Sequence, residues 1–258
     1  MLLLHIAAFH LDIDSQRTSL WHRLTPRTRV LCALLFVFAT ALTPNGHWST
    51  WAVYAVGLLT VLLLSQVTLP VLLRRVAIEF TFVSVVLLGT LFRSEGEILW
   101  KWGMLHITTV GLMVLGSVML KALLSLLALN LLILTTSIPA LLNALVALRM
   151  PPLLVAILAS MYRYIAVLID EFNSMRRAAL SRNLMNGNHW QRLVAGHMMG
   201  ALFIRTYERG DRIHQAMLSR GYTGLPPAVD VLKGGRLDIL ALTFTMLLTL
   251  TGQLIYFF

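Results

Sequence analysis

The sequence contains few charged residues and a single cysteine. Only 12% of its 258 residues are charged, whereas 58% are hydrophobic, and the mean hydropathy is +0.78. This small number of charged residues cannot cover the surface of a water-soluble domain. The composition therefore indicates an integral membrane protein. The one cysteine, Cys32, lies in an apolar run, which excludes a disulfide framework and a cysteine metal cluster.

Several motifs are also missing. The first residues, MLLLHIAAFHLDID, have no basic segment and no small-residue cleavage site, so we expect no cleaved signal peptide. The sequence has no Gly-x-x-x-x-Gly-Lys-Ser/Thr loop for a nucleotide. The apolar runs hold only isolated serines and threonines, which disfavours a membrane-embedded hydrolase. His5 and His10 have the wrong spacing to share one helix face, so we expect no metal site there.

Basic residues outnumber acidic ones by 21 to 11, and they are unevenly distributed. Between Glu171 and Leu237, four acidic residues accompany ten basic ones: Arg176, Arg177, Arg182, Arg192, Arg205, Arg209, Arg212, Arg220, Lys233 and Arg236. In so apolar a protein, this basic block indicates the cytoplasmic side of a membrane rather than nucleic acid.

Apolar runs occur at 30–43, 48–64, 76–92, 107–134, 153–169 and 239–258. Crossing a bilayer takes about 17–25 apolar residues, and an uncharged turn at 44–47 joins the first two runs as a hairpin. Arg163 lies in the middle of 153–169, where an arginine costs about 2.5–3.5 kcal/mol, so we expect that run not to span. Cytoplasmic arginines precede the first and third runs: Arg17, Arg23, Arg27, Arg29, Arg74 and Arg75.

Five spans with a cytoplasmic N-terminus satisfy this charge distribution. We expect an all-α, multi-pass protein of the inner or plasma membrane. Residues 1–134 would hold an N-terminal segment and four transmembrane helices, 135–237 a cytoplasmic helical region, and 238–258 the last transmembrane helix. In the cytoplasmic region, Ser137 and Pro139 are expected to begin one helix, and Pro151 and Pro152 the next.

Two stretches of the cytoplasmic region repeat each other. AALSRN and AMLSRG, thirty-eight residues apart, align Ala178, Leu180, Ser181 and Arg182 with Ala216, Leu218, Ser219 and Arg220. Each stretch is expected to end a helix, because Asn183 and Gly221 tolerate the left-handed closing conformation.

A cation in a last helical turn has a structural explanation, since it stabilises the helix dipole by about 0.3–1 kcal/mol. The repetition favours a functional one. Each guanidinium would present a rigid fork of donors to a carboxylate on another protein, and Ala178 and Ala216 would let the tip enter a groove.

These residues resemble a known family. MRRAALSRN and IHQAMLSRGYTG are similar to the duplicated Ala-Arg-Gly signature of the T component of energy-coupling factor (ECF) transporters, most closely to the cobalt-type CbiQ branch. SLWHRLTPRTRVL, TTSIPALLNALVALRMPPLL and RYIAVLIDEFNSMRRA resemble other segments of that branch, so the resemblance covers nearly the whole chain. Ser181 and Ser219 stand where the family usually has alanine, and Asn183 replaces the first glycine.

The resemblance implies a non-catalytic importer subunit with no cofactor of its own. Family T components join two P-loop ATPase subunits, which bind ATP and Mg²⁺, to a membrane S component that binds the metal; a small accessory membrane subunit is a further expected partner. The branch implies cobalt, with nickel as the alternative, and an anionic-lipid scaffold is the alternative outside transport. The implied ATPase-coupling residues are Arg182, Arg220, Ser181, Ser219, Ala178, Ala216 and Gly221.

Four other basic residues are secondary candidates: Arg205, Arg209, Arg212 and Lys121. The three arginines share one helical face, which either meets solvent or lipid headgroups or faces an ATPase, and Glu208 can pair with Arg212. Lys121 lies at membrane depth in GSVMLKALLSLL. It either has a function, snorkels to the interface, or pairs with Glu79.

Overall fold

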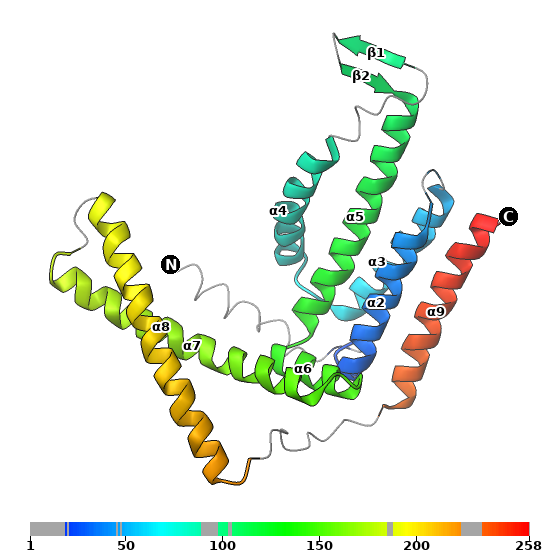
Figure 1. Ribbon diagram of the computed structural model, residues 1–258. Helices are drawn as coiled ribbons and strands as arrows, with labels where there is room; N and C mark the ends of the chain where they lie inside the picture. The colour runs from blue at the N-terminus through cyan, green and yellow to red at the C-terminus, as the bar shows by residue number, and fades with distance from the viewer. Residues whose placement is uncertain are drawn as a thin grey trace. The chain divides into compact units, whose positions relative to one another are not determined.

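The computed structural model describes residues 19, 21–44, 46, 48–88, 98–102, 105–184, 188–222 and 234–257. His5 and His10 lie outside these residues. The described ranges form eight helices and one short hairpin, which confirms the expected helical class (Figure 1). The helices are α2 (Pro26–Leu42), α3 (Trp48–Ser65), α4 (Leu69–Leu88), α5 (Thr109–Thr135), α6 (Ile138–Ala147), α7 (Pro152–Ser181), α8 (Asn188–Ser219) and α9 (Arg236–Phe257).

The chain divides into two compact units. One comprises Met1–Ala144 with Val231–Phe258, and the other comprises Leu145–Asp230. Helices α2, α3, α4, α5 and α9 belong to the first unit, and α7 and α8 to the second. The boundary between the units falls within α6, after Ala144, and the last helix returns to the first unit.

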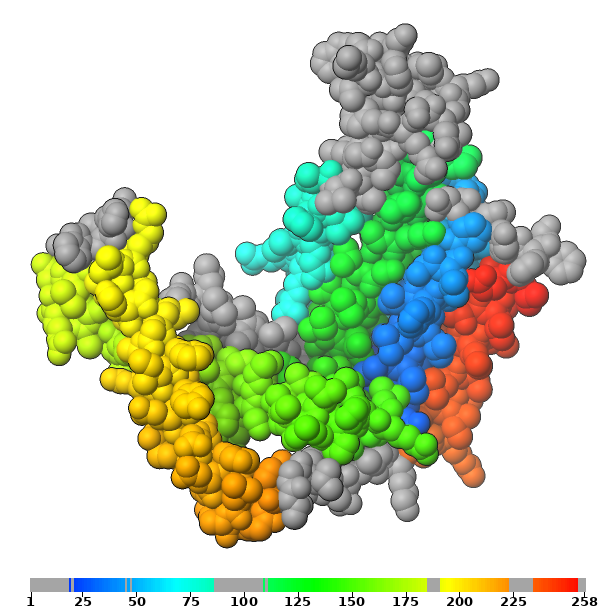
Figure 2. Space-filling view, viewed as in Figure 1, coloured from blue at the N-terminus to red at the C-terminus, as the bar shows by residue number. Residues whose placement is uncertain are grey.

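Helix α5 lies at the centre of the first unit, where it packs against α2, α3 and α4. Helix α9 packs against α2 and α3, and α2 lies between α5 and α9 on the face seen in Figure 2. Tyr54 is fully buried among Phe36 and Trp51, at ring-centroid distances of 5.8 and 6.3 Å. Gly252 permits the contact between α3 and α9, because a Cβ atom there would lie 2.5 Å from the Tyr54 ring.

Local sequence explains where the helices begin. Helix α6 starts directly after Ser137, whose carbonyl accepts the backbone N–H of Leu141 at 2.9 Å, and α7 starts at Pro152. Both starts were expected. Helix α4 begins at Leu69, earlier than the apolar run at 76–92, because Arg74 and Arg75 interrupt the hydropathy without interrupting the helix.

Among the residues that the structure describes, four helices have the length and hydropathy to cross a membrane: Trp48–Ser65, Gly111–Thr135, Pro152–Ser181 and Arg236–Leu254. This set includes α7, whose run at 153–169 was expected not to span. It does not include α2, which has only 17 residues, or α4, which carries Arg74, Arg75 and Glu79. The tertiary packing nevertheless groups α2 and α4 with α5, and it groups α7 with α8.

A two-stranded antiparallel hairpin lies between α4 and α5. Strands β1 (Ile98–Trp102) and β2 (Leu105–Thr108) pair Lys101 with His106 and Trp102 with Leu105. The sequence predicts a loop at 93–106, and the hairpin gives the described part of this connection a regular structure.

Candidate functional site

The two repeated stretches form the ends of α7 and α8. These helices end at Ser181 and Ser219, so Arg182 and Arg220 each directly follow the last helical residue. Asn183 and Gly221 then adopt positive φ angles of 53° and 80°. The expected left-handed closing conformation is therefore present at both ends.

The end of α7 is closed by two backbone hydrogen bonds. The N–H of Leu184 donates to the carbonyl of Ala179 at 3.1 Å, and the N–H of Asn183 donates to the carbonyl of Leu180 at 3.0 Å. This pair of bonds is the Schellman motif, which satisfies carbonyl groups that the helix leaves without partners.

The end of α8 repeats these bonds thirty-eight residues later. The N–H of Tyr222 donates to the carbonyl of Met217 at 3.0 Å, and the N–H of Gly221 donates to the carbonyl of Leu218 at 2.9 Å. The two helix ends therefore share one local backbone structure, although one is closed by asparagine and the other by glycine.

The serines before the two arginines make matching contacts. Ser181 Oγ donates to the carbonyl of Ala178 at 2.9 Å, and Ser219 Oγ donates to the carbonyl of Ala216 at 3.0 Å. Each hydroxyl group is thus satisfied within its own helix. This explains physically why serine can replace a small apolar residue at both positions.

Arg182 and Arg220 are exposed, and within the described residues neither guanidinium group has a hydrogen bond or an ion pair. Leu180 and Leu218, two residues earlier, are 52% and 53% exposed. Each helix end therefore presents a cation beside an apolar side chain. Such a tip suits a groove that combines a carboxylate with an apolar wall.

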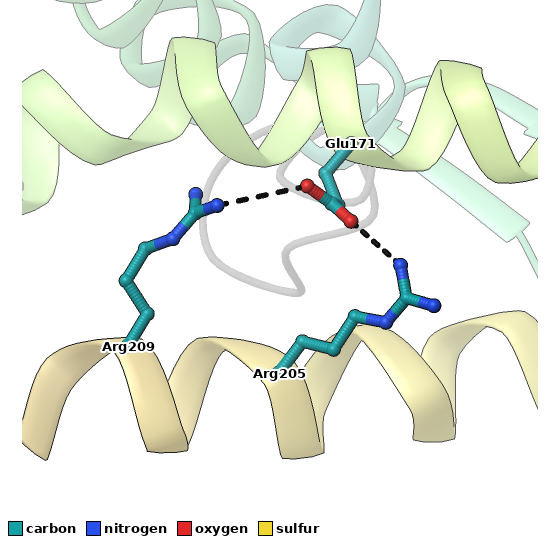
Figure 3. A network of polar contacts seen from close by, with 3 residues as sticks. All are labelled: Glu171, Arg205 and Arg209. Carbon is teal, nitrogen blue, oxygen red and sulfur yellow. Dashed lines mark hydrogen bonds and ion pairs between the residues drawn. The ribbon is translucent and has the colours of Figure 1, made fainter. Parts of the chain in front are cut away.

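Glu171 of α7 links the two long helices (Figure 3). Its carboxylate lies between two arginines of α8: Arg205 donates to Oε1 at 2.7 Å, and Arg209 Nη2 lies 3.8 Å from Oε2. The alternatives derived from sequence placed these arginines against solvent, lipid headgroups or an ATPase. The geometry directs two of them to α7 instead.

The third arginine of that face makes a local contact. Arg212 pairs with Glu208 one turn away, at 3.9 Å, as expected. Both side chains are more than half exposed, so this pair adds little to stability. Of these three arginines, Arg205 and Arg209 are the two that pair with Glu171 of α7.

The Glu171 contact lies well away from the two tips. Glu171 is eleven residues before Arg182, and Arg205 is fifteen residues before Arg220. At 1.5 Å per residue, the tips lie about 16 and 22 Å from the contact along their helices. The Glu171 contact therefore joins the two helices at a point between the start of each helix and its tip, rather than at the tips themselves.

Lys121 lies inside the first unit, with its Nζ 5.7 Å from the centroid of the Trp51 ring. Glu79 instead accepts a hydrogen bond from Asn130 Nδ2 at 2.6 Å. The suggested pairing of Lys121 with Glu79 is therefore wrong, because different faces of α5 hold the two groups. Lys121 has a cation–π contact in place of an ion pair.

Sequence reasoning did not select Glu171 or Asn130. The sequence is compatible with the Glu171 contact, because it places a glutamate on one predicted helix and two arginines four residues apart on the next. This spacing does not determine which faces of the two helices meet. Within the described residues, no group of three or more histidine, cysteine, aspartate or glutamate side chains is placed to hold a metal ion.

Comparison with known proteins places these features in a family. The family described as cobalt transport protein, CbiQ, matches residues 17–231, which include both long helices and both tips. The energy-coupling factor transporter transmembrane protein EcfT of Thermosediminibacter oceani is 30% identical over 219 residues, covering 80% of this chain and 81% of that protein. EcfT of Bacillus subtilis is 29% identical over 223 residues, covering 80% and 82%.

A third relative carries cobalt transport in its name. A fused cobalt transport protein, CbiMQ, from Methanocorpusculum labreanum is 35% identical over 153 residues, which are 56% of this chain and 24% of that protein. Since the family match spans most of the chain and the EcfT relatives align along most of their own length, this protein belongs to the CbiQ family of ECF transporter T components.

Proposed function

We propose that this chain is the coupling subunit of an ATP-driven ECF importer for cobalt. As a T component it is a non-catalytic membrane subunit, and its partners are ATPase subunits and a substrate-binding S component. The observation that carries the proposal is the pair of matching helix ends, each closed by the same backbone bonds and each presenting an exposed arginine.

The two tips are the contacts with the ATPase subunits. Arg182 seats in a groove of one ATPase copy and Arg220 in the groove of the other, where each guanidinium meets a carboxylate. When ATP binding draws the ATPases together, α7 and α8 move with them. Glu171 keeps the two helices in register, so that the movement of both tips reaches the membrane as one displacement.

The S component, in the membrane, receives this displacement and releases its metal. Cobalt is supported by the description of the matching family and by the name of the fused relative. A small accessory membrane subunit is a further partner in this proposal.

The proposed topology has five spans and a cytoplasmic N-terminus. It is supported by the packing of α2, α3, α4, α5 and α9 in one compact unit. The remaining long helices, α7 and α8, then lie on the cytoplasmic side with the basic block, where the ATPases are. Arg163, exposed on α7, avoids the cost of a charge at the bilayer centre in this arrangement.

Charge reversal at the tips tests the proposal. The tagged chain is produced with its ATPase and S subunits, and Arg182→Glu, Arg220→Glu and the double variant are compared with the unmodified chain. Each single change should lower ATPase recovery about tenfold or more, because a carboxylate then faces a carboxylate. The double variant should recover no ATPase and should import no cobalt.

Arg163→Glu is the matched control, since it makes the same charge change on α7 about 28 Å from the tip. It should leave ATPase recovery unchanged. Full ATPase recovery by the double variant would contradict the proposal, and loss of binding to anionic vesicles alone would favour a lipid scaffold. Nickel uptake without cobalt uptake would replace the substrate and leave the coupling role in place.

A further inference from the structure

A cleft opens in the first unit where α2 and α9 begin. Its walls come from residues 22–26, Arg29 and residues 235–238, and its volume of about 550 Å³ is in the range of small-ligand sites. The first residues of the two helices lie at the same end of the unit (Figure 1). Segments more than two hundred residues apart in the sequence therefore share one cleft.

Positive charge dominates the described residues that line this cleft. They include three arginines, Arg23, Arg29 and Arg236, but one acidic residue, Asp238. Arg23 and Arg236 are exposed, and neither has a hydrogen bond or an ion pair within the described part of the chain. Arg29 is buried and donates to backbone carbonyls, which carry no net charge. The two exposed guanidinium groups are therefore available to an anion from outside the chain.

Asp238 shapes the cleft rather than pairing with the exposed arginines. It is 6% exposed, its Oδ1 accepts from the N–H of Thr25 at 2.8 Å, and its Oδ2 accepts from the N–H of Gly235 at 2.8 Å. The carboxylate thus fastens the start of α9 to the residue before α2. Two helix N-termini meet here, and their dipoles also favour an anion. A phosphate group suits such a site, because it offers several acceptor oxygens to arginine.

Large apolar side chains follow the cleft along α9. Leu237, Ile239 and Leu240 are 47%, 64% and 63% exposed. In the proposed topology α2 and α9 enter the bilayer from the cytoplasmic side, so Arg23 and Arg236 lie at the level of the lipid headgroups and these apolar residues at the level of the acyl chains. A free phosphate ion would contact the arginines alone, whereas a phospholipid would contact both sets of residues.

We propose that this cleft binds the headgroup phosphate of an anionic phospholipid from the cytoplasmic leaflet. Arg23 and Arg236 donate to the phosphate oxygens, and the acyl chains lie against the exposed apolar residues of α9. The bound lipid joins the start of α2 to the start of α9. This site rests on the proposed function for its orientation in the membrane, and it involves neither helix tip.

Arg23→Gln combined with Arg236→Gln tests the site, because it removes both available guanidinium groups. Lipid binding by the purified chain in neutral detergent can be followed by native mass spectrometry, with phosphatidylglycerol as the probe and phosphatidylcholine of the same acyl chains as the zwitterionic comparison. The unmodified chain should bind phosphatidylglycerol about tenfold more tightly than phosphatidylcholine. The double variant should bind phosphatidylglycerol about ten- to thirtyfold more weakly than the unmodified chain.

Arg74→Gln combined with Arg75→Gln is the matched control. It removes the same charge from the start of α4, outside the cleft, and should leave phosphatidylglycerol binding unchanged. Without lipid, both double variants should unfold at the temperature of the unmodified chain. Added phosphatidylglycerol should raise that temperature for the unmodified chain and for the control, but not for the cleft variant.

Equal loss of binding in the two double variants overturns the inference, because it would show attraction to basic charge in general. Unchanged binding by the cleft variant also overturns it, as does displacement of phosphatidylglycerol by equimolar inorganic phosphate, which would identify a free phosphate site. In each case normal ATPase recovery leaves the proposed function intact. Selective phosphatidylglycerol binding by a chain that recovers no ATPase would overturn the proposed function and leave the lipid site in place.

Discussion

Arg29 is a buried cation that joins separate segments of the first unit. It is 6% exposed, and its guanidinium group donates to the carbonyls of His22, Leu24 and Thr135. Thr135 is the last residue of α5, so Arg29 attaches the start of α2 to the point where the chain leaves the bundle. Asp238 of α9 accepts from the backbone N–H of Thr25 at 2.8 Å, which brings the last helix to the same place.

Replacing Arg29 by methionine should destabilise the protein by about 3 kcal/mol, because buried carbonyl groups lose their donors. Arg29→Lys should cost less, since it keeps a charged donor but loses the fork that reaches several carbonyls at once. The measurement is unfolding of the purified chain in detergent. Arg27→Met, at an exposed neighbouring arginine, is the control and should change little; equal stability of the Arg29→Met and Arg27→Met variants would contradict this role.

The role of Arg29 could not be read from the sequence. There it belongs to a cluster with Arg17, Arg23 and Arg27, all expected to mark the cytoplasmic side. Its partner Thr135 is 106 residues away, and only the packing of α2 on α5 brings them together. The same limitation applies to Glu79 and Asn130, which lie 51 residues apart.

At the scale of the element, the helix ends were predictable because their structure is local. The bonds that close α7 and α8 join residues three and five positions apart, and Asn183 and Gly221 are the residues that favour them. The contact between the helices was not predictable in this way. It joins Glu171 to Arg205 across 34 residues and depends on how the two helices cross.

Glu171→Gln should uncouple the two long helices without unfolding them. The pair with Arg205 is partly exposed, so its loss should cost at most about 1 kcal/mol. We expect normal ATPase recovery but less cobalt imported per ATP hydrolysed, because each tip can then move without the other. Both quantities can be measured with the complete transporter in proteoliposomes.

Glu208→Gln is the matched control for this change. It removes an acidic partner from the same group of arginines, but only the local pair with Arg212 within α8. Its import per ATP should equal that of the unmodified transporter. An equal loss in both variants, or no loss with Glu171→Gln, would show that Glu171 has no part in coupling.

At the scale of the whole molecule, composition identified a helical membrane protein, and hydropathy located most of its helices. Hydropathy did not distinguish α7, which is long and apolar enough to span, from α4, which is interrupted by charges. Tertiary packing supplies that distinction, because α4 packs in the five-helix unit and α7 packs with α8. The amphiphilic character of a helix alone does not reveal which of its neighbours it will join.

The central claim is that both helix ends bind ATPase subunits, and single-cysteine crosslinking tests it most directly. Cys32 is the only cysteine and is buried, so Cys32→Ala provides a background for Ser181→Cys and Ser219→Cys. With a photoreactive maleimide attached, both variants should form adducts with the ATPase in the assembled transporter. Ser160→Cys, exposed on α7 about 31 Å from Ser181, should form none. Adducts at Ser160 but at neither tip would contradict the account.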